Sequence, residues 1–240
     1  MATTLSPYAL VQIGSNRILD SLPETDRMAI MPKLIKVSLP VRKEIYEQDR
    51  PIDQAYFLTS GLASMSAHME DGSMVEVGMV GAEGFVGAPL LFSNGRATQK
   101  TFMQVEGEAL CISARGLLCL CEKHPALHAV LLRFCGALYS QSSQFVACNR
   151  LHEAEERLAR WLLMVQDRVA SPELPLTHEF IAIMLGTRRS TVTIAAGILQ
   201  RMGSIEYNRG VIHVLNRDQL QHTACECYQR SRTFVEHAFE

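Results

Sequence analysis

Apolar residues between positions 176 and 199 recur at the spacing of two short helices joined by a turn. The first stripe lies between Thr177, which can cap a helix start, and Gly186, which gives a helix end its backbone freedom. Its members are Phe180, Ile181, Met184 and Leu185. A second helix is predicted from near Thr187, with apolar positions at Val192, Ala195, Ala196, Ile198 and Leu199. Its first two turns are basic and hydroxylic, with Arg188, Arg189, Ser190, Thr191 and Thr193.

Two alternating apolar runs follow at once and flank Asn208, Arg209 and Gly210, which is the signal of a β-hairpin. A helix-turn-helix followed by a hairpin with a basic tip is typical of a winged helix, in which the second helix reaches base edges and the hairpin reaches phosphates. An ordinary helical hairpin without a binding role is the alternative interpretation, because amphipathic helix pairs are common.

The N-terminal half alternates with the period of β-strands and predicts a double-sheet jelly roll. The predicted strands cover residues 34–41, 44–47, 55–58, 62–68, 74–80 and 101–112. Residues 18–31 precede them as a short helical segment. The predicted fold class is therefore α+β.

Pro125 opens a long helix over residues 125–149, followed by a hinge at Asn149, Arg150 and Leu151. A further helix over residues 152–170 has its apolar positions at Leu158, Trp161, Leu162 and Val165. We therefore expect a β-sheet domain over residues 1–124, a helix with an interface seam over 125–149 and a DNA-binding domain over 150–240.

Composition agrees with two domains, since 240 residues at 48% hydrophobic content can bury two modest cores. The net charge is only −2, but residues 177–217 contain five arginines against two acidic residues, a local patch suited to phosphates. No apolar run approaches the roughly 20 residues of a membrane span, and residues 1–17 lack a signal-peptide core. We expect a cytoplasmic protein without membrane contact, whose seven cysteines are reduced.

The pattern E-F-I-A-x-x-L-G-x-x-R-x-T-V-x-x-x-x-x-x-L, from Glu179 to Leu199, resembles the recognition motif of the Crp/Fnr superfamily of bacterial transcription regulators. Residues 150–215 are similar to the C-terminal domain of that family, and residues 47–61 resemble part of a cyclic-nucleotide-binding domain. The segment from Cys225 to Tyr228, CECY, is similar to the tail of a subgroup of these regulators whose sensed signal is generally unassigned. The resemblance implies that residues 1–124 form an effector domain and that the helix over 125–149 is a dimerisation helix. It also implies a homodimer through that helix, an inverted-repeat site in double-stranded DNA, and contact with RNA polymerase.

Arginine forks bond guanine and hydroxyls bond bases or phosphates, so four residues are predicted to contact bases: Arg188, Arg189, Ser190 and Thr193. Arg189 is the strongest candidate, while Arg188 is equally compatible with a solvated charge. Five residues are predicted to contact phosphates: Thr177, His178, Thr191, Arg201 and Arg209. Relative to the best-known family pattern, Ser190 replaces a glutamate and Ile194 an arginine, so the operator is expected to differ.

The glycine-rich segment over residues 81–92 matches the family's phosphate loop, and Gly84 and Gly87 are expected to permit its turns. The charged partners are missing, because Ala88 stands where the family has its glutamate, and Gln99 and Lys100 lie where it has its arginine. We therefore disfavour cyclic AMP as the ligand. Three alternatives stay open: a shifted loop in which Arg96 or Lys100 supplies the cation, a different ligand, and a purely structural jelly roll. Ser142 and Ser143 match positions that contact the bound nucleotide in relatives, so they are candidate effector contacts. The alternative interpretation is that both are simply exposed residues of the helix surface.

Two C-x-C pairs, Cys119 with Cys121 and Cys225 with Cys227, invite comparison with metal sites, the second having His222 nearby. Residues two apart on a helix point to different faces, so we predict buried free thiols and no metal site unless the segment is irregular. No cysteine precedes Cys111, so an iron–sulfur cluster of the family's oxygen-sensor type is not expected, nor is haem.

Enzymatic chemistry is also disfavoured. A cupin-type metal site requires an H-x-H pair, and only His68 lies in the relevant strands. No serine has the G-x-S-x-G context of a nucleophile elbow. The remaining alternative to a DNA-binding regulator is a ligand-binding signalling module whose helix-turn-helix contacts protein.

Overall fold

The computed structural model describes residues 14–169 and 171–240. The predicted lack of a signal peptide concerns mainly residues 1–13, which lie outside the described residues. In the described part of the chain, no helix is both long enough and apolar enough to cross a membrane.

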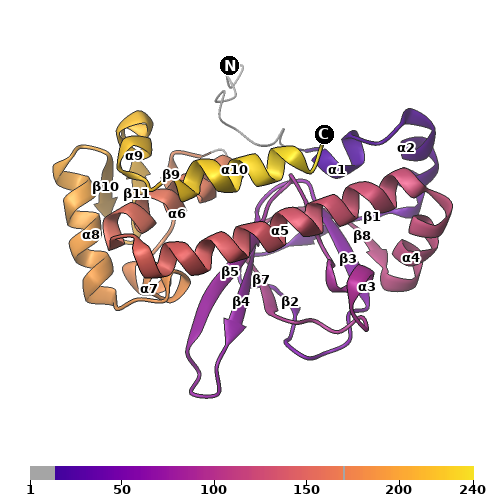
Figure 1. The fold of residues 1–240 in the computed structure, drawn as a ribbon, viewed down its shortest axis with the longest axis horizontal. Helices are drawn as coiled ribbons and strands as arrows, with labels where there is room; N and C mark the ends of the chain where they lie inside the picture. The colour runs from indigo at the N-terminus through magenta and orange to yellow at the C-terminus, as the bar shows by residue number, and fades with distance from the viewer. Residues whose placement is uncertain (1–13, 170) are drawn as a thin grey trace.

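Two four-stranded antiparallel sheets form the N-terminal domain and confirm the predicted jelly roll (Figure 1). The first sheet has the order β1 (Ile35–Leu39), β8 (Gly107–Ser113), β3 (Gln54–Leu58) and β6 (Phe85–Val86). The second has the order β2 (Glu44–Tyr46), β7 (Lys100–Val105), β4 (Leu62–His68) and β5 (Met74–Val80).

The single strand predicted over residues 101–112 is wrong, because β7 and β8 belong to different sheets and separate at Glu106. The reason is a tight corner between two glycines. A Cβ atom on Gly107 would lie 2.1 Å from the carbonyl oxygen of Ser60, and Gly61 has a φ of +78° against the backbone of Glu106. Only residues without side chains allow the two backbones to approach so closely.

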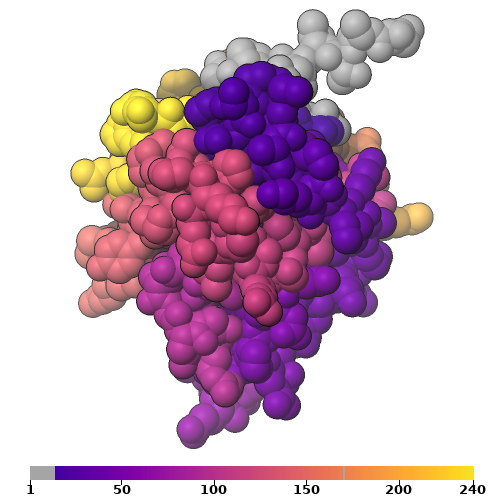
Figure 2. Space-filling view, turned by 90° about the vertical axis from the view of Figure 1, so that its right-hand side faces the viewer, coloured from indigo at the N-terminus to yellow at the C-terminus, as the bar shows by residue number. Residues whose placement is uncertain are grey.

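Short helices cover the ends of the jelly roll. They are α1 (Arg17–Asp20), α2 (Glu24–Ile30) with the 3₁₀ turn η1 (Met31–Lys33), α3 (Pro89–Phe92) and α4 (Ala114–Lys123). The helical segment expected over residues 18–31 is thus present but broken into α1 and α2. Arg17 of α1 pairs with Glu236 at 2.5 Å, which brings the two ends of the described chain side by side (Figure 2).

The predicted long helix is confirmed as α5 (Pro125–Leu151), which runs across the molecule (Figure 1). The hinge predicted at Asn149 to Leu151 is wrong, because these residues are still helical. The chain leaves the helix at His152, which has extended backbone angles (φ −107°, ψ 149°). The next helix, α6 (Ala154–Val169), starts two residues later than expected, and Ala170 lies outside the described residues.

The C-terminal domain contains α7 (His178–Leu185), α8 (Arg189–Arg201), β10 (Ile205–Asn208), β11 (Val211–Val214), α9 (Arg217–Thr223) and α10 (Cys227–His237). The predicted winged helix-turn-helix is confirmed. A strand not predicted, β9 (Glu173–Leu174), adds a third strand beside β11. Helix α10 returns along α5 (Figure 1).

Two main hydrophobic clusters stabilise the chain. The first joins the jelly roll to α1, α4 and the first half of α5. The second joins α6, α7, α8 and the wing, but it also contains Leu62 and Met79 from the jelly roll. The two domains therefore share a packed interface.

Candidate nucleic-acid interface and ligand pocket

Local capping positions α7 as the sequence predicts. The Thr177 side chain accepts a hydrogen bond from the Phe180 N–H at 3.2 Å, and Gly186 ends α7 in the left-handed conformation (φ +59°). Arg188 is the extended residue before α8, and its carbonyl accepts from the N–H of Val192.

The underside of α8 is buried against α6, which fixes the helix in one orientation. Val192, Ala195, Ala196 and Leu199 are at most 2% exposed, whereas Ile198, predicted to be buried, is partly exposed. Trp161 and Leu158 of α6 belong to the same cluster, as predicted. A helix held along one side presents its opposite side as a rigid surface.

The outer face of the first turn of α8 is open to solvent. Arg188, Arg189, Ser190 and Thr193 are all exposed. The Arg189 side chain is 72% exposed, and its only ion-pair contact in the described residues is a 4.0 Å approach to Glu179. Such a long, exposed contact costs little to break, so the guanidinium is free to bind elsewhere.

His178, which the sequence predicts to contact a phosphate, links three elements of the domain. Its ring stacks on Tyr207 of the wing with centroids 3.9 Å apart, and its Nδ1 lies 3.1 Å from Oγ1 of Thr193. Burial, with the nearby Arg189 guanidinium, lowers the pKa of His178. The stacked imidazole positions Thr193 and the wing, and with its lowered pKa it would contact a phosphate through a hydrogen bond and not through an ion pair.

The other predicted phosphate contacts lie around this face. Thr177 is exposed beside the start of α7, and Thr191 is partly buried on α8. Arg201 is exposed at the far end of α8, roughly 18 Å along the helix axis from Arg189. Arg209 is exposed at the tip of the wing with a φ of +47°, next to Gly210.

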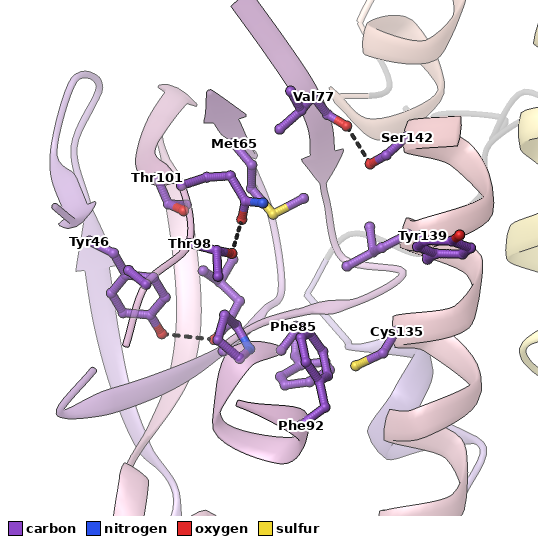
Figure 3. Close-up of a pocket in the computed structure, with 17 residues that line it drawn as sticks. Tyr46, Met65, Val77, Phe85, Phe92, Thr98, Thr101, Cys135, Tyr139 and Ser142 are labelled. Atoms are coloured by element: carbon purple, nitrogen blue, oxygen red, sulfur yellow. Dashed lines mark hydrogen bonds between the residues drawn. The ribbon is translucent and has the colours of Figure 1, made fainter. Parts of the chain in front are cut away.

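A cavity of about 270 Å³ lies between the jelly roll and α5 (Figure 3). Tyr139 and Cys135 reach it from α5, and Phe85 and Phe92 from the glycine-rich segment. Its polar groups are uncharged: the Tyr46 hydroxyl donates to the Val86 carbonyl, and Thr98 bonds Gln99 at 2.7 Å. The described lining contains no acidic or basic side chain.

Only some of the predicted effector residues meet at this cavity. Gly87, Ala88, Gln99 and Ser142 line it, and the Ser142 hydroxyl donates to the Val77 carbonyl at 2.7 Å. Three others do not line it: Gly84, Lys100 and Ser143.

Gly84 and Lys100, and also Arg96, have other contacts. A Cβ on Gly84 would lie 1.9 Å from Cζ of Phe134, so Gly84 serves close packing against α5 and has no positive φ. Lys100 pairs with Glu44 at 2.6 Å, and Arg96 donates to the Asp49 carbonyl. Neither of these cations reaches the cavity.

The assumption that Cys225 and Cys227 lie together on a helix is wrong. Cys225 occupies the irregular link between α9 and α10, and Cys227 is the first residue of α10, so their sulfurs converge. They meet Cys148 and His152, which lie four positions apart at the end of α5. His222 turns away to bond the Asp218 carbonyl. The C-x-x-x-H spacing at the end of α5 was the available signal, because residues at i and i+4 share a helix face.

Comparison with known proteins assigns both domains. A cyclic nucleotide-binding domain model matches residues 36–124, and a Crp-like helix-turn-helix domain model matches residues 156–223. The chain is 26% identical over 158 residues to the regulatory protein CysR of Synechococcus elongatus, covering 62% of this chain and 69% of CysR.

Solved structures share the fold. FixK2 from Bradyrhizobium japonicum superposes with a TM-score of 0.69 at 18% identity, covering 80% of this chain and 98% of FixK2. A CRP-family transcriptional regulator from Thermus thermophilus superposes with a TM-score of 0.66 at 21% identity, covering 78% of this chain and 96% of that regulator. With both domain families matched in this order along the jelly roll, long helix and winged helix, the chain belongs to the Crp/Fnr superfamily of transcriptional regulators.

Proposed function

We propose that this regulator binds an inverted-repeat site in double-stranded DNA as a homodimer, with one α8 in the major groove of each half-site. The observation that carries the proposal is the exposed basic start of α8, held rigid by its buried underside, with Arg209 on the adjacent wing tip. Arg189 would read a guanine, Arg188, Ser190 and Thr193 would contact neighbouring bases, and Arg209 would bind a phosphate.

An apolar seam on α5 supports the homodimer. Leu132, Tyr139 and Val146 are 42%, 76% and 74% exposed and recur every seven residues, the spacing at which one face of a helix meets a partner helix. Gly136 and Ser143 are exposed between them and allow close approach. To bind two half-sites, two copies joined along this seam would have to present their α8 helices about 34 Å apart, which is one turn of DNA. We expect the DNA-bound dimer to contact RNA polymerase.

The uncharged cavity supports an effector without a phosphate. A phosphate there would be buried with no cation to pair with, which is costly. A small, largely apolar molecule with one or two hydrogen-bonding groups would suit Tyr139, Gln99 and Ser142.

The test is selection of the full-length protein against a random duplex library, followed by binding to the enriched duplex and to a scrambled duplex at several salt concentrations. Arg189→Ala should weaken binding to the enriched duplex by roughly 1–3 kcal/mol and relax preference at one base pair. Arg209→Ala should weaken binding to both duplexes alike and should reduce by about 1 the slope of the logarithm of affinity against the logarithm of salt concentration.

Arg50→Ala is the matched control. Arg50 is an exposed arginine of the jelly roll that pairs with Glu47, so its removal should change the affinity for neither duplex. If no duplex is enriched above competitor, DNA binding is rejected in favour of a protein-contact role. Equal losses on both duplexes for Arg189→Ala would reject its base-reading role.

A further inference from the structure

A compact group of three cysteines and one histidine lies where the long helix ends. The sulfurs of Cys148, Cys225 and Cys227 and a ring nitrogen of His152 all lie within 4.8 Å of one another. The three cysteines are at most 6% exposed and form a separate buried cluster. Cys148 lies in the last turn of α5 and His152 directly follows that helix, while Cys225 lies in the link before α10 and Cys227 is its first residue. The group therefore joins segments that are about 75 residues apart in sequence.

We propose that these four side chains bind a single zinc ion. Zinc with sulfur ligands at about 2.3 Å and nitrogen at about 2.0 Å in tetrahedral geometry separates two sulfurs by roughly 3.8 Å and sulfur from nitrogen by roughly 3.5 Å. The Cys148 and Cys225 sulfurs are 3.5 Å apart, and the Cys227 sulfur is 3.6 Å from Nδ1 of His152. Small side-chain movements would therefore complete the shell.

Hydrogen bonds around the group match those that orient metal ligands. Nδ1 of His152 faces the sulfurs, while its Nε2 lies 3.1 Å from Oε2 of Glu226, so a carboxylate fixes the outer side of the ring. The Gln144 side-chain amide donates to the Cys227 sulfur at 3.0 Å. With both contacts made, the Cys227 sulfur and Nδ1 of His152 still point toward each other.

A buried arginine close to the group can balance the negative charge of a zinc site with three thiolates. Arg160 is 2% exposed, and its guanidinium lies over the Phe145 ring and bonds the Met164 sulfur. Its Nε has no hydrogen-bond partner, and no carboxylate forms an ion pair with it among residues 14–169 and 171–240. Zinc with three thiolates and a neutral imidazole carries a net charge of −1, which would compensate this cation.

Two other chemistries fit less well. An iron–sulfur cluster distributes its ligands over several irons, so ligand atoms bound to different irons lie farther apart than the 4.8 Å that spans this group. A disulfide between Cys148 and Cys225 would require the sulfurs to approach to about 2.05 Å and would not explain the convergence of Cys227 and His152.

The first experiment is elemental analysis of the full-length protein purified under reducing conditions, together with cobalt substitution. We expect one zinc per chain and, after replacement, thiolate-to-cobalt charge-transfer absorption with intense tetrahedral d–d bands. Absence of bound zinc combined with absence of these bands on cobalt addition would overturn the proposal, as would a Cys148–Cys225 disulfide that persists in metal-free protein.

Matched variants assign the ligands. Cys225→Ser and His152→Ala should lose the zinc, whereas Cys119→Ser and His222→Ala should retain it, since Cys119 belongs to the other C-x-C pair and His222 bonds backbone. Equal zinc content in all four would overturn the assignment.

Glu226→Gln removes the outer carboxylate from a 70% exposed position, so it should leave the fold and the cobalt spectrum intact while weakening zinc affinity roughly 10- to 100-fold in chelator competition. Unchanged affinity would contradict the site geometry. All these measurements are made without DNA, so they stand apart from the test of DNA binding.

Discussion

Glu76 is a carboxylic acid enclosed between the two domains. It is 4% exposed, and it accepts hydrogen bonds from the Ser64 hydroxyl at 2.6 Å and from the Trp161 indole N–H at 2.8 Å. Burial raises the pKa of Glu76 from 4.5 to about 7, although both hydrogen bonds favour the charged form. The side chain is therefore partly protonated at neutral pH.

This shift predicts a pH-dependent stability. A group whose pKa is higher in the folded state stabilises the fold fully below its unfolded pKa, and that stability is lost as the pH rises through the folded value. Between about pH 4.5 and pH 7 the Glu76 contribution should fall by an amount on the order of 3 kcal/mol. Glu76→Gln should remove this fall in urea unfolding measured at pH 5 and pH 8.

The exposed Glu47→Gln change is the control and should leave the pH dependence of the wild type. An unchanged slope in Glu76→Gln would contradict the assignment.

Glycines show what a sequence reveals at the residue scale. Gly186 was predictable, because a helix end of this kind is encoded by the residues beside it. The packing role of Gly84 was not, since it depends on Phe134, which lies 50 positions later and arrives only when α5 folds over the jelly roll. The same applies to the Cys148–Cys225 approach, which joins residues 77 apart.

Helix α5 has three working faces. One is buried in the jelly-roll core through Leu127, Leu131 and Phe134, a second lines the cavity through Cys135 and Ser142, and a third carries the exposed seam. All three faces carry apolar residues. The sequence therefore predicts the helix clearly, but it does not indicate which residues pack against which neighbour.

The seam predicts the oligomeric state. Val146→Glu places a charge on each side of the proposed helix pair, so the protein should become monomeric by light scattering after size exclusion. Leu118→Glu replaces an exposed leucine on α4, outside the seam, and should leave the wild-type mass unchanged. A dimeric Val146→Glu protein would contradict the seam.

The two short strands β6 and β9 escaped prediction for a physical reason. Two residues are too few to show alternation, and each strand exists only through a partner distant in sequence, Phe57 with Phe85 and Leu174 with Ile212. Long, strongly patterned elements were predictable, whereas elements created by tertiary contact were not.

At the scale of the whole molecule, the DNA-binding domain is docked on its own jelly roll. Phe180 of α7 contacts the Phe102 ring edge-on with centroids 6.5 Å apart, and Gly186 approaches Val75 of β5. Arg168 of α6 pairs with Glu83 at 2.7 Å, both being at most 2% exposed. No sequence pattern indicated this interface.

The buried pair predicts a large stability change. Arg168→Met leaves the Glu83 carboxylate buried without its cation, which should cost about 3–5 kcal/mol in urea unfolding. Adding Glu83→Gln should recover part of the loss, because the amide needs no countercharge.

Arg50→Met removes an exposed pair with Glu47 and should cost less than about 1 kcal/mol. Similar losses for Arg168→Met and Arg50→Met would show that the interface opens freely in solution.

Ser142 and Ser143 are neighbours on α5, yet one bonds β5 at the cavity wall and the other lies in the seam. A molecule that displaces the Ser142 hydroxyl from the Val77 carbonyl would act on the same helical turn that carries Ser143. In the proposed dimer, we therefore expect occupancy of the cavity to change how tightly the two subunits pair.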